Sequence, residues 1–128
     1  MEEIKTELAP LLDYPFSQAI AHDGALYVSG QVPIDPETGS VVSDDIREQT
    51  KQTLDNLDRI LQAAGTSFDN VLKATVYLDD IDDFATVNET YSEYVSEPFP
   101  ARSAFEVGEL ADVFEIDLLV EIDAIVVL

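Results

Sequence analysis

Arg102 is the first residue in the sequence that suggests chemistry. The chain of 128 residues contains only 6 Lys and Arg, and this cation lies within the apolar stretch of residues 100–105. A guanidinium placed inside a strand is expected to face an anion. That anion is either one of the chain's own carboxylates or the carboxylate of a ligand, which a guanidinium binds through two parallel charge-assisted hydrogen bonds.

Glu121 is the second candidate, because it lies between Val120 and Ile122 in a segment that is apolar on both sides. Carboxylates are rarely buried unless they are paired or do chemistry, so the position suggests a general acid or base. Two plainer interpretations stay open: an ion pair with Arg102, and an exposed residue at a sheet edge. Asp123 follows on the same face of the strand and is a rival for the same role.

Asn88 and the pair Ser29-Gly30 carry weaker signals. Asn88 falls within the apolar face of a predicted helix, where a buried amide more often holds a loop backbone than contacts a ligand. Ser29-Gly30 ends a predicted strand before a loop with prolines, and a glycine there lets a ligand approach the main chain. His22 lies in a predicted hairpin turn with no nucleophile beside it, so we expect an exposed turn residue.

The hydrophobic pattern predicts the elements that position these residues. Strands are expected at residues 4–6, 16–21, 25–29, 71–78, 101–107 and 114–127. Asp23-Gly24 joins two apolar runs and predicts a hairpin. The prolines and the glycine within residues 33–39 mark a loop.

Two helices are expected where the pattern changes to helical periodicity. The first begins after Ser43, the predicted N-cap, and ends at Gly65. The second begins near residue 81 and ends before Pro98. Its inward face is expected to carry Ile81, Phe84, Val87, Tyr91, Tyr94 and Val95.

The order of elements, βββαβαββ, predicts one α+β domain spanning residues 1–128. Its single mixed sheet carries both helices on one face, because both crossovers pack on the same side. The last strand is apolar on both faces, with Val120 and Ile122 pointing one way and Ile125 and Val127 the other. The face without helices therefore needs a cover, and this predicts an oligomer.

The charge of the chain excludes several functions. Asp and Glu number 27 against 6 Lys and Arg, a net charge of −21, so no basic face is available for nucleic acid or for an anionic membrane. Because 46% of the residues are hydrophobic, the chain still has enough apolar surface to fold. The acidic side chains are expected on the surface, where salt screens their mutual repulsion. This pattern indicates a protein from the cytosol of a halophile, and an ordinary acidic protein is the alternative.

The residue types also exclude several kinds of metal and thiol chemistry. The sequence has no Cys and 1 His, so we expect no disulfide, no metal and no cofactor. The acidic cluster at residues 79–83 lacks the spacing of a calcium-binding loop. The N-terminus lacks the features of a signal peptide and no stretch is apolar enough to cross a bilayer, so we expect a cytoplasmic protein.

Four motifs follow one another along the chain: YVSGQVP at residues 27–33, DFATVNETY at 83–91, FPARS at 99–103 and VEIDAI at 120–125. Together they resemble the RidA (YjgF) family of enamine/imine deaminases, and the likeness runs nearly from end to end. The resemblance implies a chorismate-mutase-like fold. It also implies a homotrimer with a central barrel and ligand sites in the clefts between subunits.

The resemblance assigns roles to residues of this chain. Arg102 matches the arginine that grips the substrate carboxylate, and Glu121 matches the glutamate that handles the hydrolytic water. Ser29 and Gly30 match the loop that lines the same cleft from the neighbouring subunit. Asn88 matches an asparagine that supports the site.

Three features depart from the family pattern. Phe16 replaces a tyrosine found in many members, which keeps a ring but loses a hydroxyl donor. Ala104 stands where many members have cysteine, at a position whose backbone meets the ligand. The stretch between residues 107 and 120 is longer than usual, so Asp123 is kept as the alternative to Glu121.

The reaction that the resemblance implies is hydrolysis of reactive 2-enamino and 2-imino acids to 2-keto acids and ammonia, without metal or cofactor. The implied substrates are 2-aminoacrylate, 2-iminopropanoate and 2-iminobutanoate. The alternative function is a non-catalytic trimer that binds keto acids or acts as a holdase. The presence of Phe16 in place of tyrosine favours this alternative. A ribonuclease activity, sometimes attached to this family, conflicts with the charge of −21 and the lone turn His22.

Overall fold

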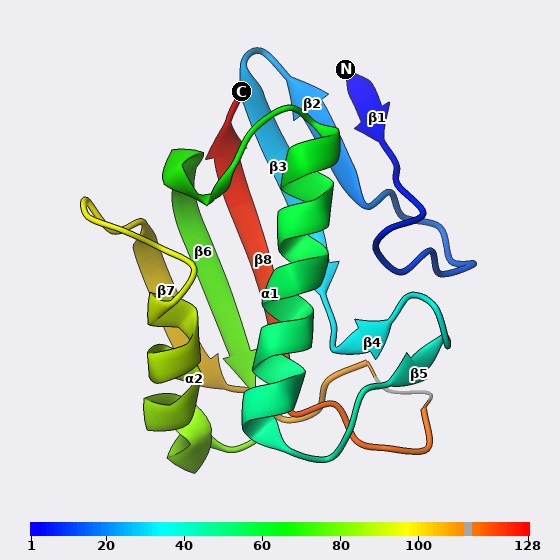
Figure 1. Cartoon of the computed structure of the whole chain (residues 1–128), viewed down its shortest axis with the longest axis vertical. Helices are drawn as coiled ribbons and strands as arrows, with labels where there is room; N and C mark the ends of the chain where they lie inside the picture. The colour runs from blue at the N-terminus through cyan, green and yellow to red at the C-terminus, as the bar shows by residue number, and fades with distance from the viewer. Residues whose placement is uncertain (112–113) are drawn as a thin grey trace.

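Over residues 1–111 and 114–128, which the computed structural model describes, a six-stranded mixed sheet carries two α-helices on one face (Figure 1). The strand order is β1-β2-β3-β8-β6-β7, and only β6 and β7 run parallel. The strands are β1 (Glu2–Ile4), β2 (Ala19–His22), β3 (Ala25–Gln31), β6 (Val71–Leu78), β7 (Ala101–Glu106) and β8 (Val120–Val127). The helices are α1 (Ile46–Ala63) and α2 (Phe84–Ser92). The predicted α+β class is confirmed.

Several boundaries differ from the prediction. The loop predicted at 33–39 contains a two-stranded ribbon, β4 (Ile34–Asp35) with β5 (Ser40–Val41). The strands predicted from residues 16 and 114 begin at Ala19 and Val120, and the first strand lies at residues 2–4. Proline, glycine and apolar residues occur in both loops and short strands, so composition alone does not separate them.

The turns and caps follow local chemistry. Asp23 and Gly24 have φ values of 49° and 78°, as the predicted two-residue hairpin turn requires. Gly65 follows α1 with a φ of 81°, also as predicted. The N-cap of α1 is Asp45 rather than Ser43, because the Asp45 carboxylate accepts a hydrogen bond from the main-chain N–H of Glu48 at 2.9 Å.

The main core lies between the helices and the sheet. The apolar face of α1, which packs against β3 and β8, carries Leu54, Leu57 and Ile60, and all three are fully buried. Burial of each such side chain stabilises the fold by roughly 1.5–3 kcal/mol. Ile81 was predicted to face inward but is exposed, because it lies in a separate 3₁₀ turn, η2 (Ile81–Asp83).

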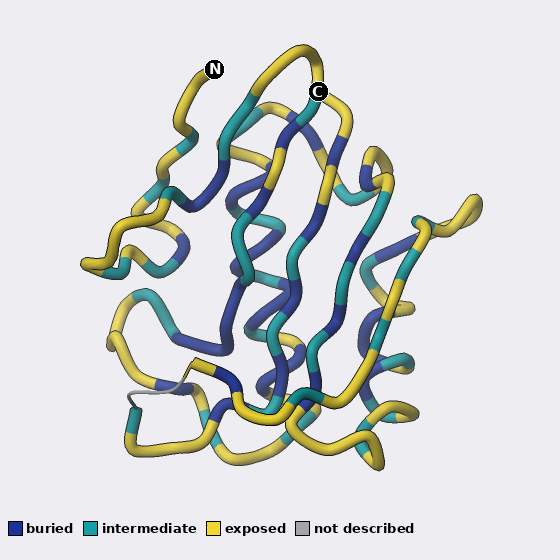
Figure 2. Tube along the Cα trace, turned by 180° about the vertical axis from the view of Figure 1, so that it is seen from behind, coloured by how far each residue is buried: buried dark blue, intermediate teal, exposed yellow. Residues whose placement is uncertain are grey.

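The face of the sheet away from the helices is open in the single chain. Seen from that side, buried and exposed positions alternate along the strands (Figure 2). Tyr27 of β3 lies opposite Ile125 of β8, and their exposed fractions are 49% and 37%. Phe105 of β7 adds a third large apolar side chain, 44% exposed. The sheet therefore has the uncovered apolar face that the sequence predicted.

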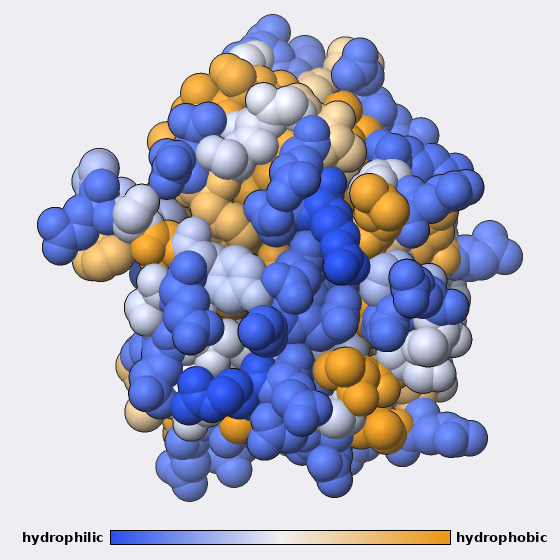
Figure 3. All heavy atoms as spheres, viewed as in Figure 1, coloured by the Kyte–Doolittle hydropathy of each residue, from blue (hydrophilic) through white to orange (hydrophobic). Residues whose placement is uncertain are grey.

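The surface over the helices is mainly hydrophilic, with small separate apolar patches (Figure 3). This agrees with the expectation that the acidic residues lie on the outside. In the part of the chain that is described, neither helix combines the length and the apolar character needed to span a bilayer.

Candidate functional site

A cavity of about 600 Å³ lies beside Glu121. It is lined by Leu12, Tyr14, Phe16, Ser29, Gly30, Val32, Ala111, Phe114 and Glu121. The cavity brings together four residues that the sequence predicted for the site: Phe16, Ser29, Gly30 and Glu121. The other lining residues are mainly apolar, and sequence analysis did not identify them, since they come from a loop before β2 and from segments outside regular strands.

Gly30 allows the Glu121 carboxyl group to lie directly against β3. A Cβ atom at position 30 would lie 2.7 Å from Cδ and 3.0 Å from Cγ of Glu121. Real Cβ atoms essentially never approach other heavy atoms below 3.0 Å. A side chain at this position would therefore displace the carboxyl group, so Gly30 helps to position Glu121.

Hydrogen bonds connect β3 to the segment that carries Phe16. The Ser29 hydroxyl donates to the main-chain oxygen of Ser17 at 2.6 Å, and the Ser29 N–H donates to the oxygen of Gln18 at 2.9 Å. These bonds hold the Phe16 ring at the cavity, where it is 49% exposed. The Ser29 hydrogen is already used, so this hydroxyl has only its acceptor capacity left for a ligand.

Glu121 and Asp123 share the open face of β8 but have different surroundings. Burial raises the pKa of the Glu121 carboxyl above its usual value, and the charge of Asp123 raises it further. Asp123 accepts a hydrogen bond from the Tyr77 hydroxyl at 2.8 Å, and this bond is the main reason that the pKa of Tyr77 is raised to about 12. Of the two carboxylates, only Glu121 lines the cavity.

Arg102 lies on the opposite face of the sheet from Glu121. It pairs with Ala74 on the side covered by helices, whereas Glu121 pairs with Tyr77 on the open side. The Arg102 Cζ atom is 4.9 Å from the ring centroid of Tyr91 and 5.5 Å from that of Phe84. Among the described residues no carboxylate lies within 4.0 Å of its nitrogens. The alternative of an ion pair between Arg102 and Glu121 is therefore wrong within one chain.

Asn88 lies on the same face of α2 as the two rings that contact Arg102, at positions four and seven residues from Phe84. Its side-chain oxygen is buried and has no hydrogen-bond partner within the described residues, and the same holds for the Tyr91 hydroxyl. The side-chain oxygen of Asn88 therefore does not contribute to the predicted contact between the Asn88 amide and a loop backbone. Ala104 follows Arg102 on the same face of β7 and packs against the core.

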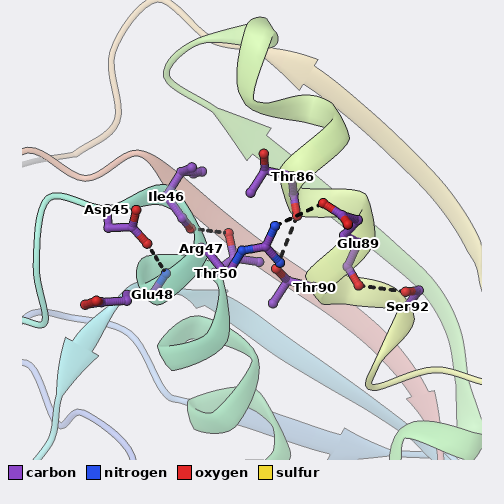
Figure 4. Close-up of polar contacts among 9 residues, drawn as sticks. All are labelled: Asp45, Ile46, Arg47, Glu48, Thr50, Thr86, Glu89, Thr90 and Ser92. Atoms are coloured by element: carbon purple, nitrogen blue, oxygen red, sulfur yellow. Dashed lines mark hydrogen bonds and ion pairs between the residues drawn. The ribbon is translucent and has the colours of Figure 1, made fainter.

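Two contacts hold α2 in place beside Arg102. Arg47 of α1 pairs with Glu89 of α2, with 3.0 Å between Nη2 and Oε2 (Figure 4). Just beyond the C-terminal end of α2, the Tyr94 hydroxyl donates to Asp55 of α1 at 2.6 Å. The ion pair is exposed and contributes little free energy, so the half-buried tyrosine contact is the stronger tether.

The structure thus divides the predicted site residues into two groups. The first group is Glu121, Gly30, Ser29 and Phe16, on the open face around β3 and β8. The second group is Arg102, Asn88 and Ala104, on the helix face around the edge strand β7. Strand β6 and the thickness of the sheet separate them, so a small ligand cannot contact both groups of one chain.

The remaining sequence candidates carry no site. His22 is exposed at the hairpin tip, where its Nε2 atom lies 3.2 Å from the Asp23 carboxylate. Within residues 1–111 and 114–128, no cluster of three or more His, Asp or Glu side chains could hold a metal ion.

Comparison with known proteins places this arrangement in a family. The family model described as endoribonuclease L-PSP matches residues 6–128. A RutC family protein of Pyrococcus horikoshii is 51% identical over 124 residues, which cover 97% of this chain and 95% of that protein. The human 2-iminobutanoate/2-iminopropanoate deaminase is 49% identical over 107 residues, covering 84% of this chain and 78% of the human protein.

The fold agrees with the sequence match. The crystal structure of the YjgF gene product of E. coli superposes with a TM-score of 0.89 and 39% identity, covering 99% of this chain and 98% of that one. The chain therefore belongs to the endoribonuclease L-PSP family, the RidA (YjgF) family that its four motifs predicted.

Proposed function

We propose that this protein is a hydrolytic deaminase of 2-imino acids whose site forms between neighbouring chains of a homotrimer. One observation carries the proposal: among the described residues neither Arg102 nor Glu121 has an ionic partner, yet the two lie on opposite faces of the sheet. A second copy of the chain brings the Arg102 group of one protomer to the cavity of another. The family relatives named as imine deaminases support the reaction type.

The Arg102 group binds the substrate carboxylate. Its guanidinium lies over the rings of Tyr91 and Phe84, and no carboxylate within residues 1–111 and 114–128 pairs with it in competition with a ligand. A bidentate pair with the substrate carboxylate fixes the orientation of the adjacent C=N bond. Asn88 supports this half of the site with a buried side-chain oxygen that has no partner among the described residues.

Glu121 handles the water. Burial raises the pKa of its carboxyl, which makes the carboxylate a stronger base toward the water. The carboxylate removes a proton as the water oxygen forms a bond to the imine carbon, and the imine nitrogen gains a proton. The resulting carbinolamine collapses as the C–N bond breaks, so that one imino acid and one water give one 2-keto acid and one ammonia.

The open face of the sheet is the surface we propose for the trimer. Tyr27, Phe105 and Ile125 expose apolar area there that a closed symmetric assembly would bury. Three such faces meeting around a threefold axis form the central barrel implied by the family. The acidic surface supports a cytoplasmic protein adapted to high salt.

An assay with a generated substrate tests the proposal. An eliminase acting on threonine releases the enamine, and semicarbazide traps the imine that remains. We expect the protein to reduce the trapped fraction in molar KCl, and Arg102→Ala to abolish this effect. Absence of any acceleration by the wild-type protein would contradict the proposal and favour a keto-acid-binding protein.

Phe16 is the one feature that favours such a binding protein, because it lacks the hydroxyl donor of the tyrosine found in many members. Phe16→Tyr separates the two possibilities. A large gain of activity in this variant over an inactive wild type would show that the loss of the hydroxyl had turned an enzyme into a binding protein.

A further inference from the structure

We infer that the cavity beside Glu121 selects 2-imino acids with bulky aliphatic or aromatic side chains over those with methyl or ethyl groups. This inference rests on the proposed function and adds the class of substrate. It starts from the walls of the cavity, which are formed chiefly by Leu12, Tyr14, Phe16, Val32, Ala111 and Phe114. Among the described lining residues, Glu121 is the only charged one.

The geometry of an imino acid assigns its side chain to this cavity. The imine carbon carries three substituents: the carboxylate, the nitrogen and the side chain. The carboxylate goes to Arg102 of the neighbouring chain, and the nitrogen must stay near the Glu121 carboxyl to receive a proton. The side chain is left to point past Glu121 into the apolar part of the cavity.

The cavity is much larger than a methyl or ethyl side chain of the substrate requires. Cavities of roughly 300–1,000 Å³ hold drug-sized ligands, and this one measures about 600 Å³. A methyl or ethyl group would leave most of the apolar wall in contact with water. Each added methylene that displaces this water strengthens binding about fourfold.

The floor of the cavity is fixed in advance. Val32 is 8% exposed and belongs to a second apolar cluster with Ile34, Val41, Leu110 and Leu118. The Asn56 side chain of α1 donates to the main-chain oxygens of Val32 and Ile34 at 3.0 and 2.9 Å. Because these bonds tie the floor to the helix, the cavity is already formed before the substrate binds. Its apolar walls can therefore discriminate between small and bulky substrate side chains.

Two measurements on the intact protein test the inference. An L-amino-acid oxidase with catalase supplies imines from alanine, 2-aminobutyrate, leucine and phenylalanine, and kcat/KM is measured for each. Calorimetry gives the Kd of 2-oxobutanoate and of 4-methyl-2-oxopentanoate. The isobutyl acid has two more carbons than the ethyl acid, so we expect it to bind about 15-fold more tightly.

The outcomes separate this inference from the proposed function. If imines are hydrolysed but the small ones are preferred, the inference fails alone. If the protein accelerates the hydrolysis of no imine but the keto acids bind in the expected order, the proposed function fails. The inference that the cavity selects bulky side chains then still holds. If the two keto acids bind equally or not at all, the inference is wrong whatever the activity.

A filled cavity provides the matched variant test. Ala111→Phe places a ring at the exposed rim of the cavity, and Ala63→Phe places the same ring on the exposed surface of α1. We expect the first variant to lower the preference for the isobutyl acid at least fivefold and the second to leave it unchanged. Leu12→Phe fills the cavity from another wall and serves if the first variant folds poorly. An unchanged preference in folded Ala111→Phe and Leu12→Phe would overturn the inference.

Discussion

Substitution of Gly30 by alanine provides a sharp test of how Glu121 is held. The added Cβ would lie 2.7 Å from Glu121 Cδ, whereas ordinary contacts lie at 3.4–4 Å. The carboxyl group must therefore move by about 1 Å, and a displacement of this size costs about 100-fold in rate for a positioned catalytic group. We expect Gly30→Ala to lower kcat/KM by about this factor while the protein stays folded.

Two controls make this result specific. Gly108→Ala adds the same methyl group where no heavy atom of the described residues, other than its chain neighbours, lies within 4 Å, and its activity should match the wild type. In the Glu121→Gln background the carboxylate is already absent, so adding Gly30→Ala should cost little more. The reasoning is refuted if Gly30→Ala keeps full activity, or if it lowers residual activity equally with and without Glu121.

Three further predictions concern charge. Because burial and Asp123 raise the pKa of Glu121, its contribution to stability is present below the ordinary value of 4.5 and is lost as pH rises through the raised value. Glu121→Gln should therefore melt at a higher temperature than the wild type at pH 7 but not at pH 4, and an equal Tm at pH 7 would contradict this. Arg102→Lys loses the two parallel hydrogen bonds that the guanidinium makes to the substrate carboxylate, so the KM for the imine should rise about 10- to 100-fold in the trapping assay. An unchanged KM would show that Arg102 does not bind the carboxylate. Because the net charge is −21, Tm should rise by about 5 °C or more between about 0.1 and 1 M KCl, as screening shortens the Debye length from about 10 to about 3 Å. A Tm that does not change with the KCl concentration would contradict adaptation to high salt.

Most of the fold could be predicted because the pattern is local. The hairpin at Asp23-Gly24, strand β6 and both helices follow from turn chemistry and from periods of two and 3.6 residues. The ribbon β4–β5 and the start of β8 could not be predicted, since their short segments lack a period long enough to distinguish strand from loop. The choice of Asp45 over Ser43 as N-cap depends on where the first turn closes.

The candidate site could be predicted from the sequence only in part. The motifs identified Arg102 and Glu121, but their faces depend on the register of β7 and β8 against β6, which is a long-range property. The same holds for the cavity, whose apolar lining residues come from separate segments. Tyr91 was predicted only as a core residue, and its spacing of seven from Phe84 was the available sign that both rings share one face of α2.

A mixing experiment tests most directly whether the site is shared between chains. Arg102→Ala and Glu121→Gln should each lose all but a small residual activity as pure proteins. When they are co-expressed in equal amounts, each mixed trimer contains one site with an intact arginine from one chain and an intact glutamate from the next. Random assembly of a cyclic trimer should restore about a quarter of wild-type activity. No recovery in mixed trimers that are verified by mass spectrometry would contradict a shared site.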